Sequence, residues 1–247
     1  MASSQRYQGQ AGYVLHGYRY QETSLIVEMF TREFGRVGMV AKGAKRATST
    51  LRGALSPFHA LTLDWSGRAE LKTLRGAEWR GGFRMLTGRA LICGFYLNEL
   101  LLKLLHRDDP HDALYDVYEA TLAELHTGGD HAAILRSFEK RLLRELGYAL
   151  LLECDAAGVV IDPDRRYQYV IDQGPVAITP GRRESGGGGG DTGLELLGQT
   201  LIDMHEDHYT DATTLQQSKS LMRHLIGHYI GHQKLHSRQL LIELQGL

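Results

Sequence analysis

The stretch that decides the fold of this chain runs from Phe34 to Phe58 and reads FGRVGMVAKGAKRATSTLRGALSPF. Its first part alternates as a β-strand does, with Val37, Met39 and Ala41 on one face. The following residues, Gly43 to Ser49, are small, polar and basic, which is typical of a mobile connection. The pattern therefore predicts a strand that leads into a long surface connection.

The same stretch carries charge of one sign. It contains five cationic side chains, and no Asp or Glu lies between Glu33 and Asp64. A solvated loop can also be rich in Lys and Arg, but the lack of any acidic residue favours a surface that binds a polyanion. The cationic residues are Arg36, Lys42, Lys45, Arg46 and Arg52.

The whole chain of 247 residues has a formal net charge of −1, which conceals an uneven distribution. Residues 1–82 contain 12 Lys and Arg against 6 Asp and Glu, whereas the remainder contains 16 against 23. Such an asymmetry suggests a nucleic-acid-facing domain joined to an acidic one. A chain of this length is also more typical of two or three small domains than of one.

The composition argues against secreted and membrane classes. Two cysteines, Cys93 and Cys154, cannot build a disulfide framework or a four-cysteine zinc site. The first ten residues lack the apolar core of a secretory signal. The longest apolar run, Ala90 to Leu105, is interrupted by polar residues and is shorter than the roughly 20 residues of a membrane span. We expect a cytoplasmic, nucleoid-associated protein.

Five short strands are predicted before residue 82, with the long connection between the third and the fourth. This is the pattern of an OB-fold, a small Greek-key barrel that commonly binds oligonucleotides. An SH3-like barrel would give a similar string of strands. The predicted strands are Tyr13 to Tyr20, Ser24 to Thr31, Arg36 to Lys42, Leu61 to Trp65 and Glu70 to Glu78.

The period becomes helical from Thr87 onward, which predicts a helical domain with a small β-containing insertion. Asp130 is a good N-cap for one of the helices, and Gly147 suits its C′ position. Two strands are expected in the insertion, at Tyr167 to Ile171 and at Val176 to Thr179. The predicted helices are Ala90 to Leu105, Asp112 to His126, Ala132 to Leu146, Leu194 to Met204, Thr214 to Ile230 and Ser237 to Leu244.

These elements give an α+β multidomain chain. The expected segments are the barrel at 1–82, a first helical part at 83–153, the insertion at 154–193 and a second helical part at 194–247. Residues 181–193 include five successive glycines, so we expect this part of the insertion to be disordered.

No catalytic set stands out, and the candidate metal ligands have unsuitable spacing. His224, His228, His232 and His236 recur every four residues, but no carboxylate or Cys completes the set, and Gly231 ends the predicted helix. The sequence around His205 and His208 lacks the HExxH spacing. We expect exposed histidines and no metal or other cofactor.

Short motifs along nearly the whole chain resemble the RecO recombination mediator family. The motifs of the first part are Glu22-Thr-Ser24, Phe30-Thr31, Gly35-Arg36, Val40-Ala41-Lys42-Gly43, Leu51-Arg52-Gly53, Leu55-x-Pro57-Phe58 and Leu74-Arg75-x-x-Glu78. Those of the second part are Gly94-x-Tyr96-Leu97-Asn98-Glu99-Leu100, Arg136-x-Phe138-Glu139, Leu146-Gly147-Tyr148 and Leu235-x-Ser237-Arg238-x-Leu240. Each motif is short, but their order is specific.

The resemblance implies a non-enzymatic role in DNA repair. Its members bind single- and double-stranded DNA, anneal complementary strands and, with RecR, help RecA replace single-stranded DNA-binding protein. Many members carry a four-cysteine zinc module after the position of Tyr148. Here only Cys154 occupies that region, so this chain is similar to the zinc-less members.

Six cationic residues are the candidates for phosphate contact in this role, because cations that replace counterions bind without reading sequence. They are Lys42, Lys45, Arg46, Arg52, Lys72 and Arg75. Phe34 and Tyr18 are candidate base-stacking surfaces, although both could instead belong to the barrel core.

A second candidate site lies on the basic helix Ala132 to Leu146. The cations Arg136, Lys140 and Arg144 follow one side of this helix, beside the apolar Leu142 and Leu146. The resemblance implies that the partner is the acidic carboxy-terminal tail of single-stranded DNA-binding protein, whose carboxylates would pair with these cations. The same charges could instead merely solubilise an outward helix face.

Two other function classes are also compatible with the sequence. An RNA-binding OB-fold protein would show the same barrel and the same basic stretch, and competition between RNA and DNA would separate the two. A metal-dependent hydrolase could use the histidines of the carboxy-terminal half. Stoichiometric bound metal would favour that enzyme.

Overall fold

The computed structural model describes residues 5–82, 85–179, 194–231, 233–237 and 239–240. The chain divides into two compact units. The first unit comprises Met1–Gly129 and Lys234–Leu247, and the second comprises Asp130–Gln233. This division differs from the four predicted segments, because the barrel and the two helices that follow it fall in one unit.

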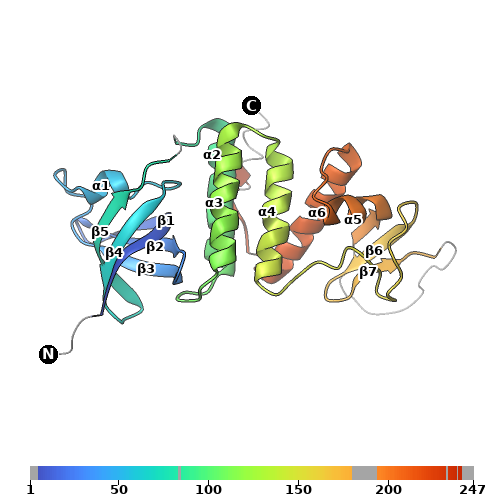
Figure 1. Cartoon of the computed structure of the whole chain (residues 1–247), viewed down its shortest axis with the longest axis horizontal. Coiled ribbons are helices and arrows are strands. Elements are labelled where there is room, and N and C mark those ends of the chain that lie inside the picture. The colour runs from blue at the N-terminus through green and yellow to red at the C-terminus, as the bar shows by residue number, and fades with distance from the viewer. Residues whose placement is uncertain (1–4, 83–84, 180–193, 232, 238, 241–247) are drawn as a thin grey trace. The chain divides into compact units, whose positions relative to one another are not determined.

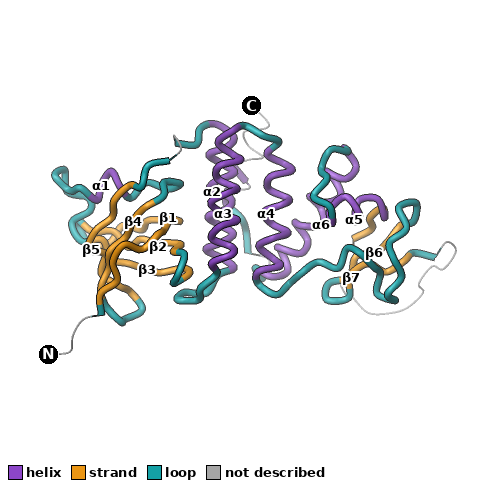
Figure 2. The backbone as a smooth tube through the Cα atoms, in the orientation of Figure 1, coloured by secondary structure: helices purple, strands orange, loops and turns teal. Residues whose placement is uncertain are grey.

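The first unit contains a barrel, a short helix and a helical hairpin (Figure 1). Its elements are β1 (Arg6–Tyr20), β2 (Ser24–Thr31), β3 (Gly35–Ala41), α1 (Leu51–Ala54), β4 (Leu61–Ser66), β5 (Leu71–Trp79), α2 (Gly88–Leu104) and α3 (Asp112–Thr127). Figure 2 shows the five strands wrapped into the barrel, with α2 and α3 as neighbouring helices.

The barrel is closed, with strand order β1-β2-β3-β5-β4, and it confirms the predicted OB-fold. Neighbouring strands are antiparallel, except that β3 pairs with β5 in parallel. Strand β1 pairs with two strands: Tyr7 lies opposite Trp65 of β4, and Tyr18 lies opposite Ile26 of β2.

Strand β1 begins at Arg6, seven residues before the predicted start at Tyr13. The early part escaped prediction because it has few apolar residues and two glycines. At Gly12 an added Cβ would lie 2.6 Å from Leu63 Cδ1, so this glycine permits the close approach of β1 to β4. The barrel therefore depends on residues that do not look like a strand.

Apolar side chains from all five strands fill the barrel. Burying a large apolar side chain contributes roughly 1.5–3 kcal/mol, so these residues dominate the stability of the barrel. The core consists of Val14, Val27, Met29, Val37, Met39, Ala41, Ala44, Leu61, Leu63, Trp65 and Leu74.

The connection between β3 and β4 is hydrogen-bonded along its first part. The amide of Arg46 donates to the carbonyl of Gly43, and the amide of Ser49 donates to the carbonyl of Arg46. Helix α1 then follows; it spans only four residues, too few to show a helical period in the sequence, and it was not predicted. Ala44 is buried against the barrel core and fixes the beginning of this connection.

Helices α2 and α3 are joined to the barrel by polar contacts in an apolar setting. Asn98 of α2 donates to the carbonyl of Leu15 at 2.9 Å and accepts a hydrogen bond from the hydroxyl of Tyr118 at 2.6 Å. The hydroxyl of Tyr13 donates to Glu119 of α3 at 2.7 Å. Buried polar groups with partners fix a packing arrangement more specifically than apolar contacts alone.

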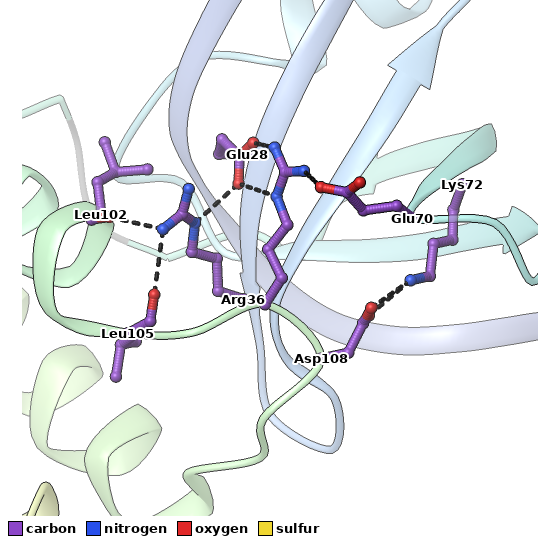
Figure 3. Close-up of polar contacts among 8 residues, drawn as sticks. Glu28, Arg36, Glu70, Lys72, Leu102, Leu105 and Asp108 are labelled. Carbon is purple, nitrogen blue, oxygen red and sulfur yellow. Dashed lines mark hydrogen bonds and ion pairs between the residues drawn. The ribbon is translucent and has the colours of Figure 1, made fainter.

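A buried carboxylate lies at the centre of a second junction (Figure 3). Glu28 of β2 has a side chain that is 1% exposed, and it pairs with Arg36 at 2.8 Å and with Arg107. Arg36 also donates to the carbonyls of Leu102 and Leu105 at the end of α2. One carboxylate therefore connects the barrel to the residues that follow α2.

The two guanidinium groups change the acidity of Glu28. Burial alone would raise the pKa of its carboxyl, but the hydrogen bonds and charges of Arg107 and Arg36 outweigh burial and lower the pKa below its ordinary value. The folded state therefore holds Glu28 ionised more firmly than the unfolded chain does.

The carboxy-terminal segment returns to the first unit and contacts α2. Glu99 accepts hydrogen bonds from the amides of His236 and Ser237, both at 2.9 Å, and from the hydroxyl of Ser237. These bonds to the charged form lower the pKa of Glu99 although burial opposes them. The predicted last helix, Ser237 to Leu244, lies mostly outside the described residues.

The second unit combines helices with a small sheet. Its described elements are α4 (His131–Glu145), β6 (Arg166–Val170), β7 (Gly174–Ala177), β8 (Leu194–Leu197), α5 (Gly198–His205) and α6 (Ala212–Tyr229). The three strands are antiparallel in the order β7-β6-β8. The predicted N-cap is confirmed, because the side chain of Asp130 accepts from the amide of Ala132.

One secondary-structure prediction in this unit is wrong. Residues 194–197 form strand β8, although we predicted a helix from Leu194 to Met204. The sequence LELL suits either state, and pairing with β6 decides in favour of the strand. The segment 181–193, predicted to be disordered, lies outside the described residues.

The loop that follows Cys154 is closed by hydrogen bonds. One carboxylate oxygen of Asp155 accepts from the amides of Ala157 and Val159, each at 2.9 Å. The amide of Asp155 donates to the carbonyl of Val159 at 2.8 Å. These bonds tie the loop between Cys154 and Val160 to itself.

The first expected outcome concerns Glu28→Gln. The variant removes a buried carboxylate shared by two partly buried guanidinium groups, so we expect its free energy of unfolding to fall by about 3–5 kcal/mol at pH 7. Because the folded pKa is lowered, this stabilisation is present above the unfolded pKa near 4.5 and is lost as the pH falls below it. Urea titrations from pH 3 to pH 8 measure both effects. Glu70→Gln, which removes an exposed partner of Arg107, should cost less than about 1 kcal/mol, and an equal cost for both variants would contradict this account.

The second expected outcome concerns metal independence. Treatment with a chelator should leave the midpoint of thermal unfolding unchanged, because hydrogen bonds from Asp155 close the loop. Asp155→Ala should lower the free energy of unfolding by about 1–3 kcal/mol. Calorimetry of the protein with and without chelator, and of the Asp155→Ala variant, measures the two effects. Asp164→Ala, which removes an exposed carboxylate, is the control for the variant. A drop of several degrees on chelation would contradict the expectation.

Candidate nucleic-acid interface

The candidate interface is built around residues 42–60, called here the basic connection, which join β3 to β4. Its beginning lies against the turn between β1 and β2. The amide of Lys45 donates to the carbonyl of Thr23 at 2.9 Å, and its ammonium donates to the carbonyl of Glu22 at 2.9 Å. Two segments that are distant in sequence are therefore brought together at one end of the barrel.

Four of the predicted DNA-binding residues are exposed on the basic connection. They lie on a backbone fixed by Ala44 and by the contacts of Lys45, so their positions are set by the barrel. Lys45 keeps its charge at the surface while it donates to a backbone carbonyl. The four residues are Lys42, Lys45, Arg46 and Arg52.

Two exposed tyrosines lie at the end of β1 that is next to the beginning of the basic connection. Tyr18 is 48% exposed and Tyr20 is 37% exposed, although large aromatic side chains usually lie in the core. The ring of His16 contacts that of Tyr18 at a centroid distance of 4.5 Å. Tyr18 was a predicted stacking residue, whereas Tyr20 was missed. Its alternation with Tyr18 on one strand face is the signal that could have identified it.

Phe34, the other predicted stacking residue, belongs to the barrel. Its ring contacts Tyr7 at 4.9 Å and Trp65 at 5.4 Å in edge-on geometry. It packs against the barrel core as a partly buried side chain. Of the two roles considered for Phe34, its contacts therefore favour packing against the barrel core.

Lys72 is not presented for phosphate contact. Its side chain is 11% exposed, and its ammonium pairs with both carboxylate oxygens of Asp108 at 2.6 Å (Figure 3). Arg75 lies three residues further on at a register shift in the pairing of β4 and β5, is exposed, and donates to the hydroxyl of Ser66. Of the two predicted residues on β5, only Arg75 is accessible.

Arg36 belongs to the basic stretch in sequence but not to the interface. Its guanidinium is occupied by Glu28 and by the last carbonyls of α2. Its charge is therefore compensated inside the protein. The uncompensated positive charge of the stretch is concentrated after β3.

The second predicted site, on α4, is largely internal. Arg136 is buried and pairs with Glu139, and Leu142 is fully buried. Lys140 is buried and donates to the carbonyls of Met204 and His205, while also pairing with Asp207 at 2.7 Å. These contacts correct the prediction that Arg136, Lys140 and Leu142 line an open slot.

Two members of that group remain accessible at the end of α4. Arg144 is exposed and Leu146 is partly exposed. The chain immediately after them lines a cavity of about 190 Å³ in the second unit. Tyr148 and Tyr229 stack at its side with a centroid distance of 4.0 Å. The lining residues are Gly147, Tyr148, Ala149, Leu150, Leu151, Tyr169, Asp172, Gly174, Leu225 and Tyr229.

The histidines considered as metal ligands do not converge. His205 lies 3.3 Å from Glu153, His208 lies 3.0 Å from Glu206, and the ring of His228 contacts Tyr229. His232 lies outside the described residues. Across the described parts of the chain, no group of three or more His, Cys, Asp or Glu side chains could hold a metal ion.

Within the described ranges, no helix has both the length and the apolar character that crossing a bilayer requires. The long helices α2 and α6 carry polar residues along their length and pack within their units.

Comparison with known proteins agrees with the barrel and identifies the family. Residues 6–83 match the family described as Recombination protein O N terminal, and residues 85–239 match Recombination protein O C terminal. The chain is 52% identical over 244 residues to the DNA repair protein RecO of Nitrosospira multiformis, covering 98% of each chain. It is 50% identical over 249 residues to that of Aromatoleum aromaticum, covering 100% of each. The DNA repair protein RecO of Burkholderia pseudomallei is 48% identical over 238 residues, which cover 96% of this chain and 84% of the relative. The chain belongs to the RecO family.

Proposed function

We propose that this chain is a recombination mediator that binds single- and double-stranded DNA and anneals complementary strands. Its membership in the RecO family gives it a role in DNA repair and recombination. The observation that supports the binding surface is the exposed basic connection beside two exposed tyrosines at one end of an OB-fold barrel. That surface suits nucleic acid.

The chemistry of annealing needs little more than this surface. Two complementary strands repel each other through their phosphates, and exposed Lys and Arg side chains replace the counterions that screen this repulsion. Stacking on tyrosine holds a base without reading its identity. Base pairing between the strands then selects the partner, so the protein itself can act on any sequence.

We place the chain in a pathway with three protein partners, on the basis of its family. It would act on DNA coated with single-stranded DNA-binding protein, bind RecR and promote loading of RecA. The proposed role involves no catalysis, since the surface only brings strands and proteins together.

A strand-annealing assay tests the proposed function. Complementary strands, each bare or coated with single-stranded DNA-binding protein, are mixed with and without this protein. We expect faster annealing of both kinds of strand. No acceleration with either kind would contradict the proposal, and preferential binding of RNA in a competition titration would favour an RNA-binding protein instead.

The third expected outcome concerns the basic connection. Replacing both Lys45 and Arg46 by Ala should weaken binding similarly for unrelated DNA sequences, because phosphate contacts carry no sequence information. For a single strand, the slope of log affinity against log salt should become shallower by roughly 1.4, since each phosphate contact contributes about 0.7. Salt titrations with a labelled strand measure the slope.

The matched control carries the same change of charge elsewhere. Arg165 and Arg166 of the second unit are exposed, with side chains that are 62% and 67% accessible. Replacing both by Ala should leave the salt slope unchanged. Equal effects of the two double variants would show that only overall charge matters and would contradict a localised interface.

We propose that the acidic tail of single-stranded DNA-binding protein docks at the end of α4, and not along the helix as the sequence suggested. Arg144 offers an exposed cation, and the neighbouring cavity offers Tyr148, Leu151 and Leu225 to an apolar side chain. A carboxylate beside a guanidinium and an apolar residue in a pocket are complementary features of such a peptide. Asp172 in the lining opposes an anion.

The fourth expected outcome follows from these opposite charges. Arg144→Ala should weaken binding of a labelled tail peptide by roughly 1.5–3 kcal/mol, the scale of a hydrogen bond to a charged group. Asp172→Asn should strengthen it, because a repulsive charge is removed. Fluorescence anisotropy measures both, with Arg166→Ala as the control. Unchanged affinity in both variants would place the tail elsewhere.

A further inference from the structure

Trp79 is an exposed aromatic residue for which neither the barrel core nor the interface described above accounts. It is the last residue of β5, and its side chain is 59% exposed. The ring of His59 lies 5.5 Å from the indole, at an interplanar angle of 46°. The indole therefore presents a large aromatic face to solvent while the neighbouring imidazole ring supports it.

The path of the chain places Trp79 at the far end of the basic connection. The connection begins beside Tyr18 and Tyr20, where the amide of Lys45 donates to Thr23. It ends beside Trp79, where the amide of Arg80 donates to the carbonyl of Ala60 at 2.9 Å. Exposed aromatic side chains therefore lie at both ends of this cationic segment.

The cations continue along the connection toward Trp79. Arg52 is exposed on α1, and Leu51 and Leu55 of the same region pack against the barrel core. Arg80, also exposed, follows Trp79 directly in sequence, and the exposed Glu78 precedes it. Arg80 and Glu78 have opposite charges beside the indole. The net positive charge near Trp79 therefore comes from the basic connection, whose described side chains include no acidic residue.

We propose that Trp79, supported by His59, is a nucleobase-stacking platform for single-stranded DNA at the end of the basic connection. A bound strand would place its phosphates along Lys45, Arg46 and Arg52 and one base on the indole. Every base has a π-face, so such stacking requires no particular sequence. The inference rests on the proposed function, because it assumes that the basic connection binds DNA.

The aromatic residues at the two ends also indicate the path of the bound strand. Tyr18 and Tyr20 serve one end of the connection and Trp79 serves the other, so the strand would follow the connection and not cross it. OB-folds bind roughly 4–16 nucleotides. A strand of that length has enough phosphates to contact the cations between the two aromatic sites.

Intrinsic fluorescence tests the platform in the unmodified protein. The chain contains two tryptophans, and Trp65 is 2% exposed in the barrel core. A change in emission on adding DNA therefore reports mainly on Trp79. We expect oligothymidylate of about 20 nucleotides to quench the emission, with the same midpoint as binding measured by anisotropy of a labelled strand.

Two variants separate stacking from simple proximity. Trp79→Ala should weaken binding of the labelled strand by about 5- to 150-fold, the equivalent of one lost base stack. Trp79→Phe keeps an aromatic face, so it should retain more of the affinity while losing the fluorescence response. Val160→Ala removes an apolar side chain that is 76% exposed in the second unit and should change neither. Circular dichroism verifies that each variant is folded.

The outcomes distinguish this inference from the function on which it rests. If the protein binds the strand at full affinity without quenching, or if Trp79→Ala binds as tightly as the unmodified protein, the platform is wrong while the proposed function stands. If the unmodified protein does not bind the strand at all, the proposed function fails as well. Quenching that is lost in Trp79→Phe, together with weakened binding by Trp79→Ala, supports the platform.

Discussion

The first unit depends on one buried carboxylate. Glu28 lies inside the junction between the barrel and the end of α2, where an uncompensated charge would be strongly destabilising. Arg36 and Arg107 compensate it, and Arg36 also satisfies carbonyls at the last turn of α2. Three separate segments are thus held in one arrangement, because each supplies a charge or an acceptor that the others need.

The cations of the first unit form two groups: some pair with carboxylates of the protein, and the others are exposed after β3. Arg36, Arg107 and Lys72 are paired with Glu28, Glu70 or Asp108, so they contribute little to the field outside the protein. The cations after β3 lie on a backbone anchored by Ala44 and by the turn that precedes β2. An anchored backbone reduces the entropy that is lost when these side chains engage phosphates. Positive charge in the sequence is therefore a poor guide to positive charge at the surface.

Sequence could predict what depends on local pattern. Alternation predicted the second and third strands closely, and Asp130 and Gly147 marked the ends of α4. It could not predict the pairing of Lys72 with Asp108, since 36 residues separate them. Nor could it predict the environment of Arg136 and Lys140. The four-residue spacing places them on one side of the helix, and Glu139 is a local partner of Arg136 on the same helix. Only the fold decides that this side is buried and that Lys140 meets the carbonyls at the end of α5.

The arrangement of aromatic and cationic residues bears on how the proposed annealing of strands would work. A protein that hydrogen-bonded to the Watson–Crick edges of a strand would have to release them before pairing. Contacts to phosphates, together with stacking on tyrosine or tryptophan faces, leave those edges free. The charged side chains exposed along the basic connection are Lys and Arg, and exposed aromatic rings lie at its ends. Such a surface can hold a strand and still present its bases, and the electrostatic cost of a second strand is lowest at the place where the first is held.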